Sequence, residues 1–107
     1  TTLEWMVAEN RHPLPNSFTL HQNYPNPFNP ITTIRYDLPQ EGHVLLTIYD
    51  ILGREVVQLV NQRMSAGYHT STWDTKNAFG SSMSGGIYFY QIQTREYTKT
   101  NKMVLLK

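Results

Sequence analysis

The sequence contains no cysteine among its 107 residues. This absence excludes disulfide bonds, thiolate metal ligands and a cysteine nucleophile. Charge is also scarce, since charged residues make up 16% of the chain and the formal net charge is +1. Such a balance gives no support for a nucleic-acid partner or an anionic membrane surface. No apolar run approaches the roughly 20 residues that a membrane-spanning helix needs, so we predict no membrane span.

A helical period is missing as well. Apolar and polar residues instead alternate in short runs separated by turns, which is typical of β-strands. The runs cover residues 33–38, 43–50, 54–60, 68–73, 87–94 and 97–107, with a shorter seed at 18–20. This pattern predicts an all-β, antiparallel sandwich of about seven strands, with a small barrel as the alternative.

The first 17 residues differ from the rest. Pro13 and Pro15 favour extended backbone there, so we interpret 1–17 as a linker or the end of a preceding domain. Residues 18–107 form the main domain. Because the chain starts without Met or a signal peptide, we expect it to be part of a larger protein.

A proline-rich block follows in residues 22–30, with Pro25, Pro27 and Pro30. Proline lacks a backbone donor, so this block cannot lie inside a sheet and should run along an edge or over one end. We expect Tyr24 and Phe28 to hold it in place by packing, and we expect the block to leave the edge of the last strand free.

The stretch Asp50 to Arg54 indicates a hairpin. Gly53 suits the left-handed position of a type I turn with a bulge, and Asp50 can accept hydrogen bonds from the turn amides.

The polar residues give little support for catalysis. His69 and Ser71 lie two apart on one predicted strand, and with Asp74 they lack a nucleophile elbow and oxyanion donors. Asp50 and Asp74 are explained as turn residues rather than a glycosidase pair. The segment 74–77 could offer oxygen ligands to calcium, but Lys76 lies among them. We therefore predict no enzyme activity, no cofactor and no metal site.

Aromatic residues suggest one binding alternative. Trp73, Tyr88 and Tyr90, together with neighbouring aromatics, would suit a sugar-stacking platform if they were exposed. Packing in the core and across strands is the competing explanation. A carbohydrate-binding or structural accessory module of a secreted hydrolase thus stays open.

Five blocks in a fixed order carry a family resemblance: LHQNYPNPFNPITTIRYDLP, VLLTIYDILGREVVQLV, AGYHTSTWD, SGGIYFYQI and KTNKMVLLK. Together they resemble the type A C-terminal sorting domain of proteins exported by the type IX (Por) secretion system. The resemblance runs from about Phe18 to Lys107. Its structural motif residues are Asn23, Tyr24, Pro25, Asn26, Pro27, Phe28, Asn29, Pro30, Asp50, Gly53, Arg54, Gly86, Tyr88 and Tyr90.

The resemblance implies an immunoglobulin-like sandwich, similar also to the flagellar hook-capping protein. It implies a non-catalytic module that directs a fused upstream cargo protein across the outer membrane, for anchoring at the cell surface or release. The implied partners are the outer-membrane secretion machinery and a sortase-like protease, which we expect to cut between Arg11 and Phe18.

The resemblance also implies which residues the translocon recognises. They are the terminal six, Lys102, Met103, Val104, Leu105, Leu106 and Lys107. We expect this segment to be a free edge strand to which a partner adds a strand. Lys99, Lys102 and Lys107 are interpreted as protecting this edge from aggregation.

Overall fold

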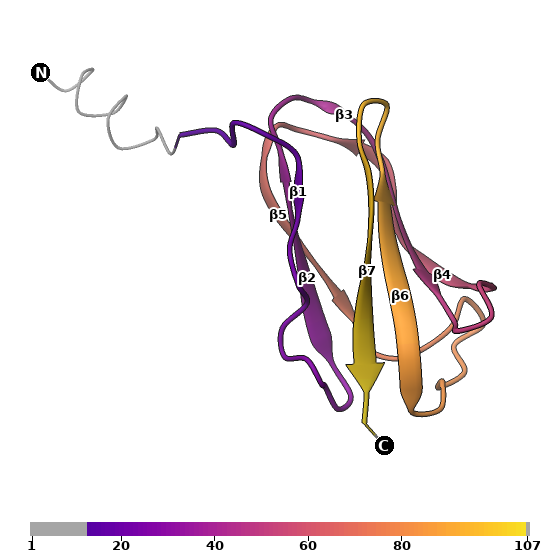
Figure 1. Cartoon of the computed structure of the whole chain (residues 1–107). Helices are drawn as coiled ribbons and strands as arrows, with labels where there is room; N and C mark the ends of the chain where they lie inside the picture. Colours follow the sequence, from indigo (N-terminus) through magenta and orange to yellow (C-terminus); the bar gives the residue numbers. More distant parts are fainter. Residues whose placement is uncertain (1–12, 107) are drawn as a thin grey trace, which may run out of the picture.

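The computed structural model describes residues 13–106, and in that range the chain forms seven strands in two sheets (Figure 1). The first sheet has the order β1–β2–β5, with β1 Thr19–Leu20, β2 Thr32–Leu38 and β5 Gly67–Trp73. The second has the order β4–β3–β6–β7, with β4 Glu55–Met64, β3 Gly42–Tyr49, β6 Gly86–Gln93 and β7 Thr98–Leu105. Neighbouring strands are antiparallel throughout. The predicted all-β, immunoglobulin-like sandwich is confirmed, and the two separate sheets rule out the barrel.

Alternation of side chains builds the core, as the sequence predicts. In β2, Ile34 and Tyr36 are buried while Arg35 between them is exposed. In β3, the buried residues Val44, Leu46 and Ile48 face the same interior. Successive side chains of a strand point to opposite faces of its sheet, so each sheet presents one apolar face to the other.

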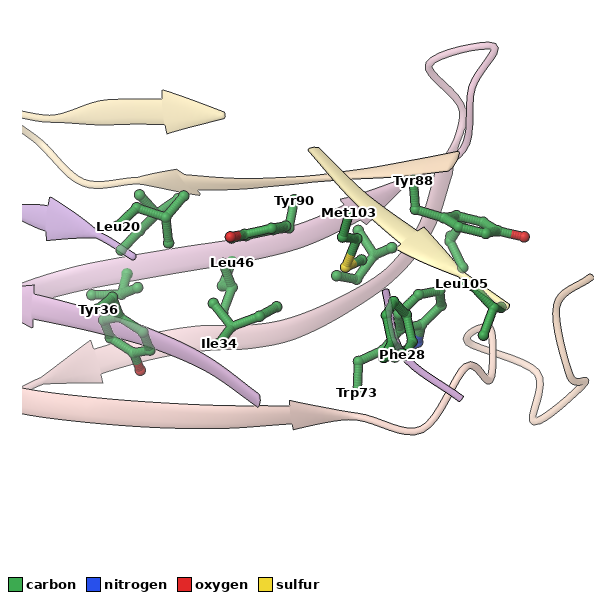
Figure 2. Close-up of a cluster of buried hydrophobic side chains, with 14 of the residues drawn as sticks. Leu20, Phe28, Ile34, Tyr36, Leu46, Trp73, Tyr88, Tyr90, Met103 and Leu105 are labelled. Atoms are coloured by element: carbon green, nitrogen blue, oxygen red, sulfur yellow. The ribbon is translucent and has the colours of Figure 1, made fainter. Parts of the chain in front are cut away.

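Aromatic side chains fill one end of this core (Figure 2). The ring centres of Phe28 and Trp73 are 5.9 Å apart, and those of Trp73 and Tyr88 are 5.2 Å apart in an edge-on arrangement. Leu105 of β7 lies beside them in Figure 2. The proline-rich block and the terminal strand therefore meet in the same aromatic cluster.

The predicted strand limits lie within two residues of the observed ones, except at the end of β4. β4 continues to Met64, past the predicted limit at residue 60, because an edge strand can pair its backbone with β3 while its side chains stay polar and exposed. The last strand starts at Thr98. Tyr97 precedes it, and its ring stacks on Phe18 at 5.3 Å.

The sandwich has two distinct ends (Figure 1). The stack of Phe18 on Tyr97 places the incoming linker beside the β6–β7 turn, and we call this the linker end. At the other end, which we call the distal end, lie the β3–β4 turn, the loop 74–85, the turn 24–31 and Leu106. The chain thus arrives at one end of the sandwich and the terminal strand runs toward the other.

The two aromatics of the proline-rich block have different environments. Phe28 is 1% exposed, as expected, whereas Tyr24 is 80% exposed, so the expectation that Tyr24 packs inward is wrong. Only the backbone of Tyr24 is held, through two 2.9 Å hydrogen bonds with Thr33.

This difference predicts two unequal stability effects. Phe28→Ala should lower the free energy of unfolding by about 3–5 kcal/mol, because it removes a buried ring. The matched variant Tyr24→Ala should change it by less than about 0.5 kcal/mol. Urea unfolding of both variants checks this, and equal effects would contradict the assigned packing.

Candidate recognition surface on the terminal strand

β7 is the last strand of the four-stranded sheet, and its pairing with β6 fixes which side chains face outward. Met103 and Leu105 are buried in the core. Lys102 and Leu106 are exposed and Val104 is half-buried, so these three lie on the outer face of the sheet. Lys107 lies outside the described residues.

We expected a free edge along this strand, and for its last residues, 104–106, that expectation is wrong. The strap, which we define as residues 21–28, runs beside β7 in a parallel bridge between Phe28 and Leu105. The Phe28 amide donates to the Val104 carbonyl at 3.0 Å, and the Leu106 amide donates to the Phe28 carbonyl at 2.8 Å. The proline-rich block therefore covers the edge that it was expected to leave open.

Two side chains of the strap add further hydrogen bonds along this edge of β7. The Val104 amide donates to Oδ1 of Asn26 at 3.0 Å, and Nε2 of Gln22 donates to the Lys102 carbonyl at 2.9 Å. Asparagine and glutamine side chains carry the same donor and acceptor groups as the backbone. Nearer the linker end, backbone groups of Thr100 point to the same side, and there no described residue bonds to them.

A buried tyrosine hydroxyl joins the strap to the four-stranded sheet. The hydroxyl of Tyr90 donates to the His21 carbonyl at 2.7 Å and accepts from the Asn23 amide at 2.8 Å. Nδ2 of Asn101 in β7 donates to the same hydroxyl at 3.3 Å. Burial raises the pKa of Tyr90, which keeps the phenol protonated beyond its ordinary range.

Asn23 is the buried polar residue at the start of the strap, at 2% exposure. Its side-chain amide donates to Oγ1 of Thr32 at 2.9 Å and to the Pro25 carbonyl at 3.2 Å. Sequence reasoning placed Asn23 in the motif without a role. The signal in the sequence was an asparagine two residues before the first proline of the block, a residue whose side chain carries its own donors and acceptor.

The outer face of the sheet continues the surface of the terminal strand. Val104 lies opposite Ile87 of β6, and Lys102 lies opposite Phe89. Directly opposed side chains on one face of a sheet are in contact range. The exposed side of β7 is therefore a mixed apolar and basic strip.

The predicted hairpin after β3 is confirmed. Oδ1 of Asp50 accepts from the amides of Leu52 and Arg54 at 3.0 and 2.9 Å, and Gly53 adopts a φ of 82°, which only glycine adopts easily. These hydrogen bonds lower the pKa of Asp50, and the bond from the Arg54 amide has the largest effect.

The structure does not assemble the weak catalytic candidates. Nε2 of His69 bonds to the Ser65 carbonyl at 2.8 Å, and its ring stacks on Tyr36 at 5.3 Å. Asp74 accepts from the Lys76 amide at 3.2 Å and pairs with its ammonium group at 3.6 Å. His69 and Asp74 each have a structural partner, and neither is oriented by a hydrogen bond toward Ser71.

The sugar-stacking platform does not form. Trp73, Tyr88 and Tyr90 are 1%, 4% and 0% exposed, so none of the three offers a ring face to a ligand. The carbohydrate-binding alternative loses the residues on which it depended.

The last candidate features in residues 13–106 are metal-ligand clusters and membrane-spanning helices. In that range no cluster of three histidine or acidic side chains is arranged to hold a metal ion. Over the same range, no helix has the length and apolar character for crossing a membrane.

The bond from Val104 to Asn26 predicts a local effect on β7. Asn26→Ala removes the acceptor, which should lower stability by about 0.5–1.5 kcal/mol and speed hydrogen exchange at the Val104 amide. Asn29→Ala is the matched control, since Asn29 is exposed and makes none of the described side-chain bonds. Unchanged exchange at Val104 in the Asn26 variant would contradict the assigned bond.

The Asp50 contacts predict a pH effect on the hairpin. Because folding lowers the pKa of Asp50, the carboxylate stabilises the turn above its ordinary pKa of 3.8 and loses this effect as pH falls through the lower folded value. The amide shifts of Leu52 and Arg54 should report a midpoint below 3.8 in an NMR titration. Asp50→Asn should abolish that transition, and a midpoint at or above the ordinary value would contradict the prediction.

Comparison with known families gives a match over most of the chain. A sequence model described as the secretion system C-terminal sorting domain matches residues 22–106. The match includes nearly all of the strap and all of β7. Among curated proteins no relative matches this chain.

Solved structures share the fold. Dimeric latent PorU from Porphyromonas gingivalis aligns with a TM-score of 0.65 and 20% identity, over 91% of this chain and 10% of that chain. PorZ from the same organism is an essential bacterial surface component of the type-IX secretion system. It aligns with a TM-score of 0.57 and 18% identity, over 82% of this chain and 11% of that chain. FlgD from P. aeruginosa aligns with a TM-score of 0.56 and 27% identity, over 69% of this chain and 57% of that chain. This chain spans about a tenth of the length of the two Porphyromonas proteins.

Proposed function

Because this chain belongs to the family of secretion-system C-terminal sorting domains, we propose that it directs a fused upstream cargo protein through the type IX translocon without catalysing a reaction itself. A domain of this family is a type IX sorting signal, which marks a protein for export across the outer membrane to the cell surface or the medium. The proposal concerns how this chain performs that role, which partner surface it offers and what happens to the cargo.

The outer face of the terminal strand is the observation that supports the proposed recognition. Lys102 and Leu106 are exposed there and flank the half-buried Val104. The strap already occupies the backbone edge beside Val104. We therefore propose that the translocon recognises side chains on this face, and not a free backbone edge.

The linker supports removal of the domain after export. Residues 13, 14, 16 and 17 are exposed, whereas Pro15 is buried. Exposed connecting segments are the preferred sites of proteolysis. A sortase-like protease would cut between Arg11 and Phe18, and the cargo would then be anchored at the surface or released.

The terminal-face proposal is tested with a cargo fusion in a bacterium that has a type IX system. Deleting residues 102–107 would also remove Met103 and Leu105 from the core, so export would be lost through unfolding alone. Two substitutions at exposed positions, Lys102→Glu with Leu106→Asp, avoid this problem. They should reduce surface cargo about tenfold or more, as a loss of about 1.4 kcal/mol of binding would do.

The control variant is Lys99→Glu, which changes an exposed lysine nearer the linker end of β7. It should leave export unchanged, and thermal unfolding should show that both variants are folded. Normal surface delivery of the folded Lys102 and Leu106 double variant would overturn the proposed terminal-face recognition.

A further inference from the structure

Large exposed apolar side chains gather at the distal end of the sandwich. Among residues 13–106, nine large hydrophobic side chains are exposed. Seven of them lie on distal-end segments: Tyr24, Ile31, Ile51, Leu52, Phe79, Ile87 and Leu106. Leu14 and Tyr68 lie elsewhere. Apolar residues scattered singly over a surface are ordinary, but their concentration at one end indicates an interaction site.

Phe79 is the most exposed of these side chains, at 92%. Its position is fixed because Oδ1 of Asn77 accepts from the amides of Phe79 and Ser81, both at 2.9 Å. The indole of Trp73 donates to the Lys76 carbonyl at 2.9 Å and ties the loop to the core. A well-ordered turn therefore holds a large aromatic ring in solvent.

Ile51 and Leu52 are displayed in a similar way, at 65% and 73% exposure. They form the tip of the β3–β4 hairpin, where Asp50 accepts hydrogen bonds from the turn amides. The Ala78 amide donates to the Val56 carbonyl at 3.1 Å. This bond brings the loop that carries Phe79 against the start of β4, close to the hairpin tip.

The charges on these two turns neutralise one another. The guanidinium of Arg54 pairs with Asp50 at 2.8 Å, and the ammonium of Lys76 pairs with Asp74 at 3.6 Å. Neither turn is left with an excess of basic charge to attract anionic lipid headgroups. The surface instead suits an apolar protein surface that accepts rigid, bulky side chains.

We propose that Ile51, Leu52 and Phe79 form a docking surface, the distal patch, which inserts into a hydrophobic cleft of a receptor protein in the export machinery. This inference rests on the proposed function and adds a second contact to the terminal face of β7. The upstream cargo joins at the linker end, so the distal patch is free to engage a receptor while cargo is still attached. Two preorganised turns also lose little conformational freedom on binding.

The test uses the full chain fused to a cargo reporter in a bacterium with a type IX system. The triple variant Ile51→Ser, Leu52→Ser and Phe79→Ser should lower surface cargo about tenfold or more. Tyr68→Ser is the matched control, because Tyr68 is 56% exposed and lies near the linker end, and it should be exported normally. Thermal unfolding of both purified chains should match that of the wild type.

A second measurement separates a protein receptor from a lipid surface. A photo-crosslinking phenylalanine analogue at position 79 should form one protein adduct in isolated cell envelopes. Excess wild-type chain should suppress that adduct, and the triple variant should not. Binding to phosphatidylethanolamine vesicles with loss of binding in the triple variant, and no such adduct, would overturn the proposal in favour of a membrane contact.

The outcomes separate this inference from the proposed function. Normal export of the folded triple variant would overturn the distal patch and leave the terminal-face proposal untouched. Normal export of the Lys102 and Leu106 double variant, together with failure of the triple variant, would overturn recognition at β7 and support the distal patch alone.

Discussion

The parallel pairing of the strap with β7 is the interaction on which the arrangement of this domain depends. It joins residues far apart in the chain, since Asn26 and Val104 are 78 positions apart. Through Phe28 it also closes the aromatic end of the core, where the ring lies against Trp73. Unpaired strand edges promote aggregation, and natural proteins cover or shorten them. Here the segment that covers the edge also places Phe28 in the core. The same segment therefore protects the edge and completes the core.

Proline and asparagine have complementary roles in this strap. Prolines restrict the backbone and cannot act as donors, which prevents the strap from offering a new regular edge to another chain. Asparagine side chains supply hydrogen bonds beside them: Oδ1 of Asn26 accepts from the Val104 amide, and Nδ2 of Asn23 donates to Oγ1 of Thr32. The hydroxyl of Tyr90 meets the backbone of His21 and Asn23. A rigid and irregular segment thereby keeps its buried polar groups satisfied, as a folded interior requires.

Local features were predictable from the sequence because their causes are local. The alternation in β2 and β3 specifies a buried face, and the Asp50 to Gly53 turn follows from residue types that tolerate it. The position of the strap was not predictable, since its acceptor is a side chain and its partner strand is at the other end of the chain. Tyr24 and Phe28 look equivalent in the sequence, yet only Phe28 faces the core. No local pattern separates them.

The covered edge also decides how a receptor can recognise the terminal strand while the domain stays folded. Four hydrogen bonds connect the strap to residues 102–106: one to Lys102, two to Val104 and one to Leu106. At about 0.5–1.5 kcal/mol each, exposing this edge costs roughly 2–6 kcal/mol, before Phe28 is removed from the core. A receptor that adds a strand there would lose roughly 30-fold to 20,000-fold in affinity. Side chains on the outer face require no such opening, so recognition of the face is the less costly route in a folded domain.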